Sequence, residues 1–193
     1  MANQDRPQGA LPVKHINGSP FNQQTNTYVI MAADTAAYFV GDFVKSAANG
    51  DAKGVPAVTK AAAGNTLRGV IVAIEPNLTD LSIVTIPATK ARDYYVEVSD
   101  SPDVVYEMQV NNTVAFLVTD LNKNANFVVA VPGTVPPNAY SATEVDAATI
   151  ATTQAHPLKL MGVVQRADVD LTADTKVLVV INQHELMGNT AGV

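Results

Sequence analysis

YYVEVSDSPDVVYEMQV, residues 94–110, contains two runs of alternating apolar and polar side chains separated by a short polar segment. In the first run Tyr94, Val96 and Val98 fall on one face, and the second run continues the same alternation over residues 104–110. A repeat of two residues is typical of a half-buried strand and not of a helix. The intervening SDSPD has turn residues, because Asp and Ser bond back to the backbone and Pro fixes φ. The stretch therefore predicts an antiparallel hairpin with one apolar and one polar face.

Further strand candidates recur on both sides of this stretch at intervals of roughly 8 to 14 residues, with Gly, Asn or Pro between them. They cover residues 27–32, 55–60, 67–74, 81–86, 113–119, 126–131, 158–166 and 176–182, with an apolar segment at 36–45. Residues 67–74 (LRGVIVAI) are nearly all apolar, as expected for a strand covered on both faces. Pro56 places its strand at a sheet edge or at a strand start. The spacing favours an all-β antiparallel barrel or sandwich, jelly-roll or β-tulip-like, over a βαβ fold.

Three regions flank or interrupt the predicted β-domain, which covers residues 27–187. Residues 1–26 are rich in Gln, Asn, Pro and Gly and cannot bury enough surface to fold alone. They form either a frayed tail or an extended arm that orders on a neighbouring molecule, with Leu11, Val13 and Ile16 as its contact residues. Residues 132–157 form an irregular excursion in which the S-x-x-E pattern at Ser141 predicts at most one or two helical turns. Residues 188–193 are predicted to be a disordered tail.

Composition excludes several functional classes. Charged residues are 16% of the 193 residues, against roughly 25% in typical domains, which favours close contact with another protein as well as a plain β-protein. The net charge is −6 and lysines and arginines are scattered, so nucleic-acid binding is not expected. No segment has the ~20 apolar residues of a membrane span, and no signal peptide is evident. We expect a protein that is made in the cytosol and stays soluble. The chain has no cysteine.

Chemistry-bearing residues form no recognisable catalytic or metal-binding motif. His15, His156 and His184 lack zinc-ligand spacing, and His184 with Glu185 is expected at the surface. The acids at 168, 170 and 174 resemble a calcium loop that lacks its central Gly and its final Glu, so a solvated loop is preferred. Five acids near the predicted hairpin are interpreted as its soluble face, with acid–base chemistry as a weaker alternative; they are Asp93, Glu97, Asp100, Asp103 and Glu107. We expect no catalytic residue, no metal and no cofactor.

The order of the segments over residues 27–187, and the residues within them, resemble those of tailed-bacteriophage virion proteins that decorate or cement the head. The resemblance is carried by GDFVKSAANGDAKGVPAVTKAAAGNTLRGVIVAIEP at 41–76, TKARDYYVEVSDSPDVVYEMQV at 89–110, and PLKLMGVVQRADVD with KVLVVINQHEL near the end. Residues 1–26 match poorly. The resemblance implies a small β-barrel, β-tulip or jelly-roll that is often trimeric and that binds the outside of the major capsid protein shell.

The resemblance implies a structural virion protein, and not an enzyme. Its partners would be the major capsid protein and two further copies in a homotrimer, with no nucleic acid and no membrane, on the outer surface of a capsid assembled in the host cytoplasm. The alternative is a fibre-base or glycan-binding module on the head surface. A third and weaker class is a hydrolase that uses the carboxylates near Asp100 and Asp103.

Overall fold

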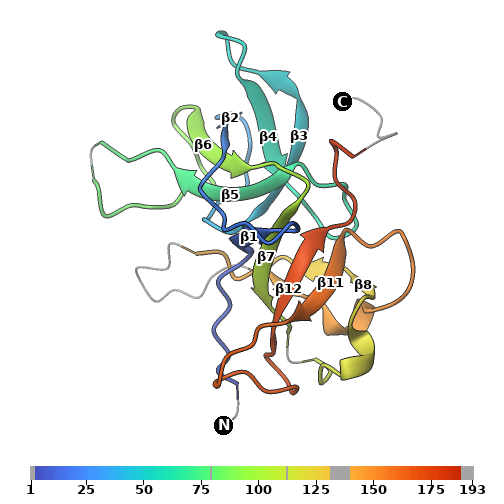
Figure 1. The fold of residues 1–193 in the computed structure, drawn as a ribbon. Coiled ribbons are helices and arrows are strands. Elements are labelled where there is room, and N and C mark those ends of the chain that lie inside the picture. The colour runs from blue at the N-terminus through green and yellow to red at the C-terminus, as the bar shows by residue number, and fades with distance from the viewer. Residues whose placement is uncertain (1–2, 79, 112, 131–139, 188–193) are drawn as a thin grey trace.

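The structure is a computed structural model that describes residues 3–78, 80–111, 113–130 and 140–187. It consists of a closed β-barrel and a five-stranded antiparallel sheet, packed against each other with the barrel on top in the view of Figure 1. The predicted all-β fold is confirmed. Within the described residues, no helix has the length and apolar character needed to cross a membrane.

The barrel contains five strands whose order is β2-β4-β3-β5-β6 and which closes where β6 pairs with β2. The strands are β2 (Asn26–Ile30), β3 (Phe43–Gly50), β4 (Pro56–Lys60), β5 (Gly69–Ile74) and β6 (Tyr94–Ser99). The β2–β4 pair is parallel and the other pairs are antiparallel. Asp51 forms the β3–β4 turn by accepting the amides of Lys53 and Val55, both at 2.8 Å. Pro56 begins its strand, as predicted.

The sheet has the strand order β1-β7-β12-β11-β8, and a two-stranded ribbon, β10-β9, lies beside it. The sheet strands are β1 (Leu11–His15), β7 (Val104–Gln109), β8 (Asn124–Ala125), β11 (Leu158–Val163) and β12 (Lys176–Ile181); the ribbon strands are β9 (Phe127–Val128) and β10 (Glu144–Val145). This half also contains two single 3₁₀ turns: η1 (Val118–Asp120) lies between β7 and β8, and η2 (Ala147–Thr149) lies between β10 and β11. The ordering keeps β1 and β8 at the edges.

Two hydrophobic cores result, and neighbouring residues of the barrel strands contribute to both. The barrel core contains Tyr28, Ile30, Tyr38, Val44, Val58, Ile71, Ile86, Val96 and Val98. The sheet core contains β7, β11 and β12 side chains together with Phe43, Leu67 and Val70 from the barrel. Along β5, Val70 therefore faces the sheet and Ile71 faces the barrel interior. The prediction that the apolar run at 67–74 is covered on both faces is therefore confirmed for its first part, whereas Ala73 near the end of β5 is exposed.

The predicted hairpin at 94–110 is wrong, although both of its strands exist. β6 pairs with β2 and β5, whereas β7 pairs with β1 and β12, so the segment between them connects the barrel to the sheet. The apolar face of each strand was predicted correctly, but the two faces enter different cores. Val96 and Val98 enter the barrel core, whereas Val104, Tyr106 and Met108 enter the sheet core. The hydroxyl of Tyr106 donates to the carbonyl oxygen of Ser99 at 3.1 Å and holds the start of the connection inside the molecule.

Two other predicted strands do not form. Residues 81–86 lie in a loop in which only Ile86 makes a bridge, to Tyr38, and residues 113–119 lead into η1. Ile86 and Phe116 are buried in the barrel core and the sheet core, but most other large apolar side chains of these two segments are exposed. In the excursion, Glu144 begins β10, and the short turn η2 that follows is capped by Asp146, which accepts the amide of Ala148. Residues 132–139 of the excursion and the predicted tail at 188–193 lie outside the described residues.

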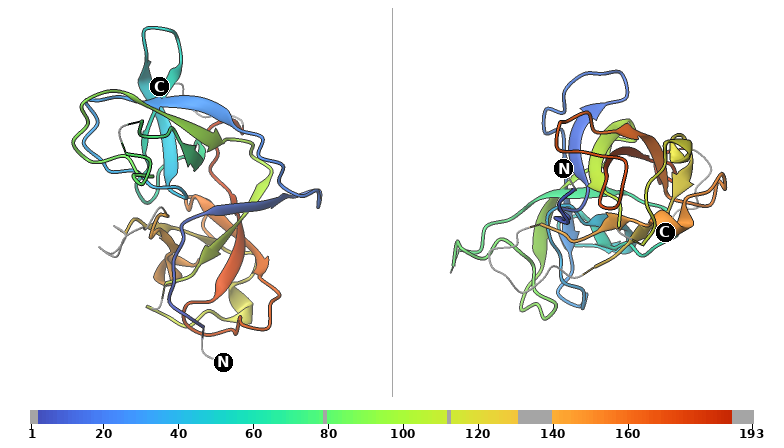
Figure 2. Two further views of the ribbon diagram at one scale, coloured as in Figure 1. Left: turned by 90° about the vertical axis from the view of Figure 1, so that its left-hand side faces the viewer. Right: turned by 90° about the horizontal axis from the view of Figure 1, so that it is seen from below.

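The N-terminal segment is extended, but part of it pairs within its own chain. Residues 3–10 run along the sheet half before β1 joins the edge of β7, as Figure 2 shows in its left view. Close contact at Gly9 fixes the path: a Cβ there would lie 2.6 Å from the carbonyl oxygen of Gly41 and 2.7 Å from the Cβ of Ser141. Both glycines have positive φ, 68° and 92°, which other residues rarely adopt.

Candidate protein-interaction surface

A long loop between β5 and β6, residues 75–93 and hereafter the β5–β6 loop, projects from the barrel at the left of Figure 1. Its base is closed by the amide of Glu75, which donates to the carbonyl oxygen of Tyr95 at 3.0 Å. An ion pair between Glu75 and Arg92 joins the two ends of the loop. The Arg92 guanidinium lies over the ring of Tyr94, 4.4 Å from its centroid.

The returning half of the loop is anchored in the barrel at two points. Ile86 is fully buried and exchanges two backbone hydrogen bonds with Tyr38, at 2.9 and 3.0 Å. The Lys90 ammonium is buried and donates to the carbonyl oxygens of Asp34 and Ala36, both at 2.6 Å. Burial lowers the pKa of Lys90, and the Asp34 carboxylate at 3.6 Å partly offsets that effect. These contacts make the base of the loop a rigid support.

The outer part of the loop presents apolar side chains to solvent. Leu78 is 89% exposed and Leu81 is 73% exposed, and Ile83 and Val84 are also exposed. Asp80 orders the tip, because its carboxylate accepts both the amide and the hydroxyl of Ser82, at 3.0 and 2.6 Å. Several large apolar side chains exposed on one braced loop are typical of a surface that binds another macromolecule.

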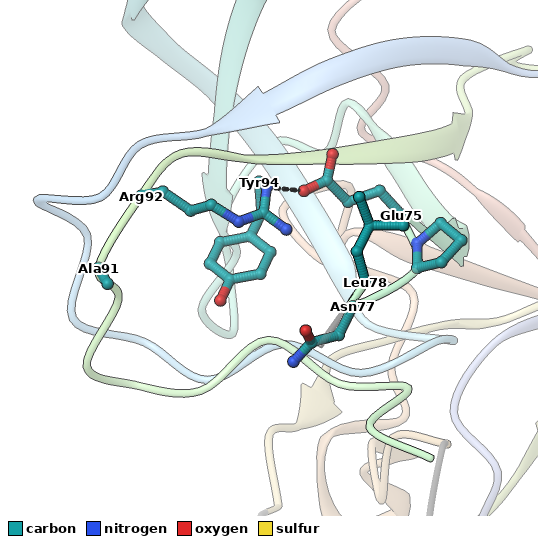
Figure 3. A pocket seen from close by; sticks show the side chains of 7 residues that line it. Glu75, Asn77, Leu78, Ala91, Arg92 and Tyr94 are labelled. Atoms are coloured by element: carbon teal, nitrogen blue, oxygen red, sulfur yellow. Dashed lines mark hydrogen bonds and ion pairs between the residues drawn. The ribbon is translucent and has the colours of Figure 1, made fainter. Parts of the chain in front are cut away.

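A cleft of about 510 Å³ lies at the base of the loop and is drawn in Figure 3. It is lined by Glu75, Pro76, Asn77, Leu78, Ala91, Arg92 and Tyr94. The Glu75–Arg92 pair crosses one wall, and the ring of Tyr94 lies beneath the guanidinium (Figure 3). The charges in the cleft are therefore already paired with each other. The cleft is therefore an apolar hollow in which the charges of Glu75 and Arg92 neutralise each other.

A second apolar hollow lies on the sheet half, between η1 and the loop that joins β11 to β12. It has a volume of about 590 Å³, and its lining includes Val118, Leu121, Val163, Val169 and Leu171. Val118 and Leu171 are exposed. The molecule therefore carries apolar surface on both of its halves.

The residues predicted to contact a partner lie on or beside β1. Leu11 is half-buried and opposite Glu107 of β7, Val13 is exposed, and Ile16 is 55% exposed. The amide of Ile16 donates to the carbonyl oxygen of Asp103 at 2.8 Å. Part of the predicted arm is thus ordered on its own chain. Contact between these three side chains and another molecule stays a prediction.

His184 is not at the surface as predicted, since it is 1% exposed. Its backbone bridges to Leu67, and its Nδ1 accepts the amide of Leu186 at 3.0 Å. Burial lowers the pKa of His184, and the positive charge of Arg68 adds to this effect. Glu185 accepts the amide of Ser46 at 2.9 Å, which ties this C-terminal segment to the barrel.

The five acids near the predicted hairpin are not brought together. Glu97 accepts two threonine hydroxyls on the barrel, and Asp93 accepts the amide of Ala32. Glu107 pairs with Arg166 on the sheet, and Asp103 is at the surface. Asp100 is buried, contrary to its assignment to a soluble face. The weaker hydrolase hypothesis stays a prediction.

A different set of acids converges near the N-terminus. Asp5, Glu144 and Asp174 have carboxylate oxygens that all lie within 4.8 Å of one another. Of the acids in the predicted incomplete calcium loop, only Asp174 belongs to this group. Three carboxylates of this kind could hold either a divalent cation or a proton. The sequence did not indicate the group, because its members are about 140 and 30 residues apart.

The β5–β6 loop was also missed, although its residues were noticed. LSIVTI at 81–86 alternates and contains β-branched residues, so it has the composition of a strand. The proline residues at 76 and 87 bracket the exposed section. Comparisons with family models, with curated proteins and with solved structures find no match to this chain.

Proposed function

We propose that this protein is a structural virion protein that binds the outside of a tailed-phage capsid and cements neighbouring capsomers of the major capsid protein. The observation that carries the proposal is the set of apolar side chains held in solvent by the braced β5–β6 loop. The segment resemblance over residues 27–187 supports the capsid as the partner. In this proposal the protein performs no chemical turnover.

The energetic argument concerns what the exposed side chains gain on binding. Burial of a leucine side chain contributes about 1.5–3 kcal/mol, so Leu78 and Leu81 together would contribute about 3–6 kcal/mol to a contact. Anchorage of the loop at Ile86 and Lys90 reduces the conformational entropy that binding must remove. Repetition on a symmetric lattice adds avidity to modest contacts. A protein that binds the assembled shell and not its separated subunits stabilises the shell by mass action.

We further propose that the functional unit is a homotrimer. The second apolar hollow, around Val118 and Leu171, provides surface that capsid binding through the β5–β6 loop would leave uncovered. Sedimentation equilibrium of the purified chain tests this directly, with an expected mass of three chains.

The glycan-binding alternative has less support at the Figure 3 cleft. Sugar recognition commonly uses an open aromatic face, but one face of the Tyr94 ring is covered by the Arg92 guanidinium at 4.4 Å. The isolated protein should therefore show no specific retention on a glycan array. Specific retention that is abolished by Tyr94→Ala would favour the alternative.

The capsid proposal is tested by co-sedimentation with a panel of purified tailed-phage capsids, in expanded and unexpanded forms. We expect binding to at least one expanded shell and an increase in the melting temperature of that shell. The double variant Leu78→Ser/Leu81→Ser should bind at least tenfold more weakly. Leu186→Ser, which removes an exposed leucine outside the β5–β6 loop and outside the second apolar hollow, is the matched control and should still bind.

The variants should not alter the fold, because all three leucines are exposed and such substitutions usually change stability by less than about 0.5 kcal/mol. Wild-type protein that binds no shell above the level of an unrelated protein would contradict the proposal. So would a double variant that binds as tightly as the wild type.

A further inference from the structure

The first residues of the chain form a strap across the sheet half, defined here as residues 3–10. At its start, the Asn3 side-chain amide donates to the carbonyl oxygens of Asp170 and Ala173, both at 2.8 Å. At its end, the amide of Ala10 donates to the carbonyl oxygen of Gly41 at 3.0 Å. Between these points the strap is held by Gln109 of β7, whose Oε1 accepts the amide of Arg6 at 2.9 Å.

Gln109 also brings three carboxylates together. Its Nε2 donates to Asp5 of the strap at 2.9 Å, to Glu144 of β10 at 3.0 Å, and to Asp174 of the β11–β12 loop at 3.5 Å. A side-chain amide has only two N–H groups, so it cannot satisfy three carboxylates with linear bonds. Gln109 is itself buried, and the three carboxylates come from three different segments of the chain.

No positive charge compensates this group within the part of the chain that the structure describes. The cations of the packed elements are Arg6 on the strap, Lys176 opposite Gln109 on β12, and Arg166 on the β11–β12 loop. None of them forms an ion pair with the three carboxylates: the Lys176 ammonium lies 4.0 Å from Glu107, and the Arg166 guanidinium pairs with Glu107 and Asp168. Like charges at this separation repel unless one of them is neutralised by a proton.

We propose that the strap is a proton-dependent latch: it docks on the sheet when the Asp5–Glu144–Asp174 group holds a proton, and it loosens when that proton is lost. The docked strap brings the Asp5 carboxylate close to Glu144 and Asp174. Detachment of the strap moves the charge of Asp5 away from these two acids. A loosened strap would release Asp5 and Arg6 from Gln109 and make this part of the strap available to a neighbouring molecule. The inference concerns the strap alone and does not depend on capsid binding.

The ionisation behaviour of the group agrees with this geometry. Burial, followed by the charges of Asp5 and Asp174, raises the pKa of Glu144 to about 7. Burial and the charge of Asp5 also raise the pKa of Asp174. Because the docked state binds the proton more tightly than the detached state, docking is strongest at low pH. It weakens as the pH rises towards 7, because the Asp5 charge acts on Glu144 only in the docked state, and then levels off.

The Arg6 amide reports directly on the latch, because it donates to Gln109 only when the strap is docked. Hydrogen exchange of this amide is measured by NMR at pH 5 and pH 8, and each rate is corrected for intrinsic exchange. We expect the protection of Arg6 in the wild type to be at least about threefold higher at pH 5 than at pH 8. Protection of β12 amides serves as the internal reference for the rest of the sheet.

Glu144→Gln keeps the shape and an acceptor oxygen but removes the main titrating group, so its Arg6 protection should differ by less than about twofold between the two pH values. Asp5→Asn should have the same effect, and it lies on the exposed strap, where folding is not at risk. Asp168→Asn, an exposed acid of the β11–β12 loop outside the group, should keep the wild-type response. Equal Arg6 protection at both pH values in the wild type would overturn the proposal. A wild-type response in both Glu144→Gln and Asp5→Asn would also overturn it.

Discussion

Asp100 is a buried carboxylate at the point where the chain passes from β6 of the barrel to β7 of the sheet. It accepts the hydroxyl of Tyr28 at 2.6 Å and the side-chain amide of Asn26 at 2.9 Å, and the Arg68 guanidinium lies 3.4 Å away. Burial and the hydrogen bond to Asp100 raise the pKa of Tyr28 to about 12. Asp100 therefore joins the starts of β2 and β5 to the end of β6.

Substitution of Asp100 should be strongly destabilising. Asp100→Ala removes the acceptor of the Tyr28 hydroxyl and the negative charge that faces Arg68, so that the Arg68 guanidinium keeps only its neutral bond to the Tyr28 oxygen, at 2.8 Å. Removal of one member of a buried ionic pair typically costs about 3–5 kcal/mol. The loss is measured as the free energy of unfolding in urea. Asp103→Ala, in which the replaced side chain is 55% exposed, is the control and should cost less than about 1 kcal/mol. Equal losses for the two variants would contradict the structural role of Asp100.

His184 gives the fold a second residue whose charge state matters. Its pKa is lowered in the folded protein, first by burial, so the unfolded chain accepts a proton near pH 6.5 while the folded chain does not. Stability contributed by neutral His184 is therefore present above about pH 6.5 and is lost as the pH falls below that value. The slope approaches about 1.4 kcal/mol per pH unit until the folded protein itself takes up the proton.

This pH dependence is isolated by comparing the wild type with His184→Gln, because Glu144 has the opposite effect over part of the same range. Gln retains an acceptor for the amide of Leu186 but does not titrate. We expect the difference in unfolding free energy between the two proteins to shift in favour of the variant as the pH falls from 7 to 5. Parallel stability curves for the two proteins would show that His184 does not titrate differently on folding.

At the scale of elements, periodicity predicted strands but not their partners. The alternation at 94–99 and 104–109 identified both strands and the faces that are buried, because side-chain period is a local property. The pairing of the two strands depends on which core each apolar face enters. The residues from Ser99 to Asp103 suit a tight hairpin turn and a connection between two sheets equally well. The hairpin prediction failed for that reason.

The missed strand at 81–86 and the candidate surface share one physical cause. Residues 81–86 have strand composition, but a strand needs a neighbour with unpaired backbone groups, and closure of the barrel removes its free edges. Ile86 still reaches the barrel core, but Leu81, Ile83 and Val84 are left in solvent. The sequence therefore contained the residues of the interaction surface, but their exposure could be recognised only once the strand pairing was known.

For the molecule as a whole, the barrel and the sheet should fold as a single cooperative unit. Phe43 and Val44 are adjacent on β3, yet Phe43 belongs to the sheet core and Val44 to the barrel core. The ring of Phe43 lies 4.8 Å from that of Phe127 on β9, and Leu67 and Val70 extend the same contact. Detachment of β3 or β5 from the barrel would therefore also expose side chains of the sheet core.

Phe43→Ala tests this coupling. Truncation of a buried phenylalanine costs about 3–5 kcal/mol, which for a chain of this size corresponds to a decrease of about 6–20 °C in melting temperature. Calorimetry should show a single transition in both proteins, and amides in β4 and β11 should lose the same amount of exchange protection because both require global unfolding. Val13→Ala, in which an exposed side chain is truncated, should leave both values unchanged. Two separate transitions, or a loss of protection confined to β11, would mean that the barrel is stable without the sheet and that the shared core does not couple them.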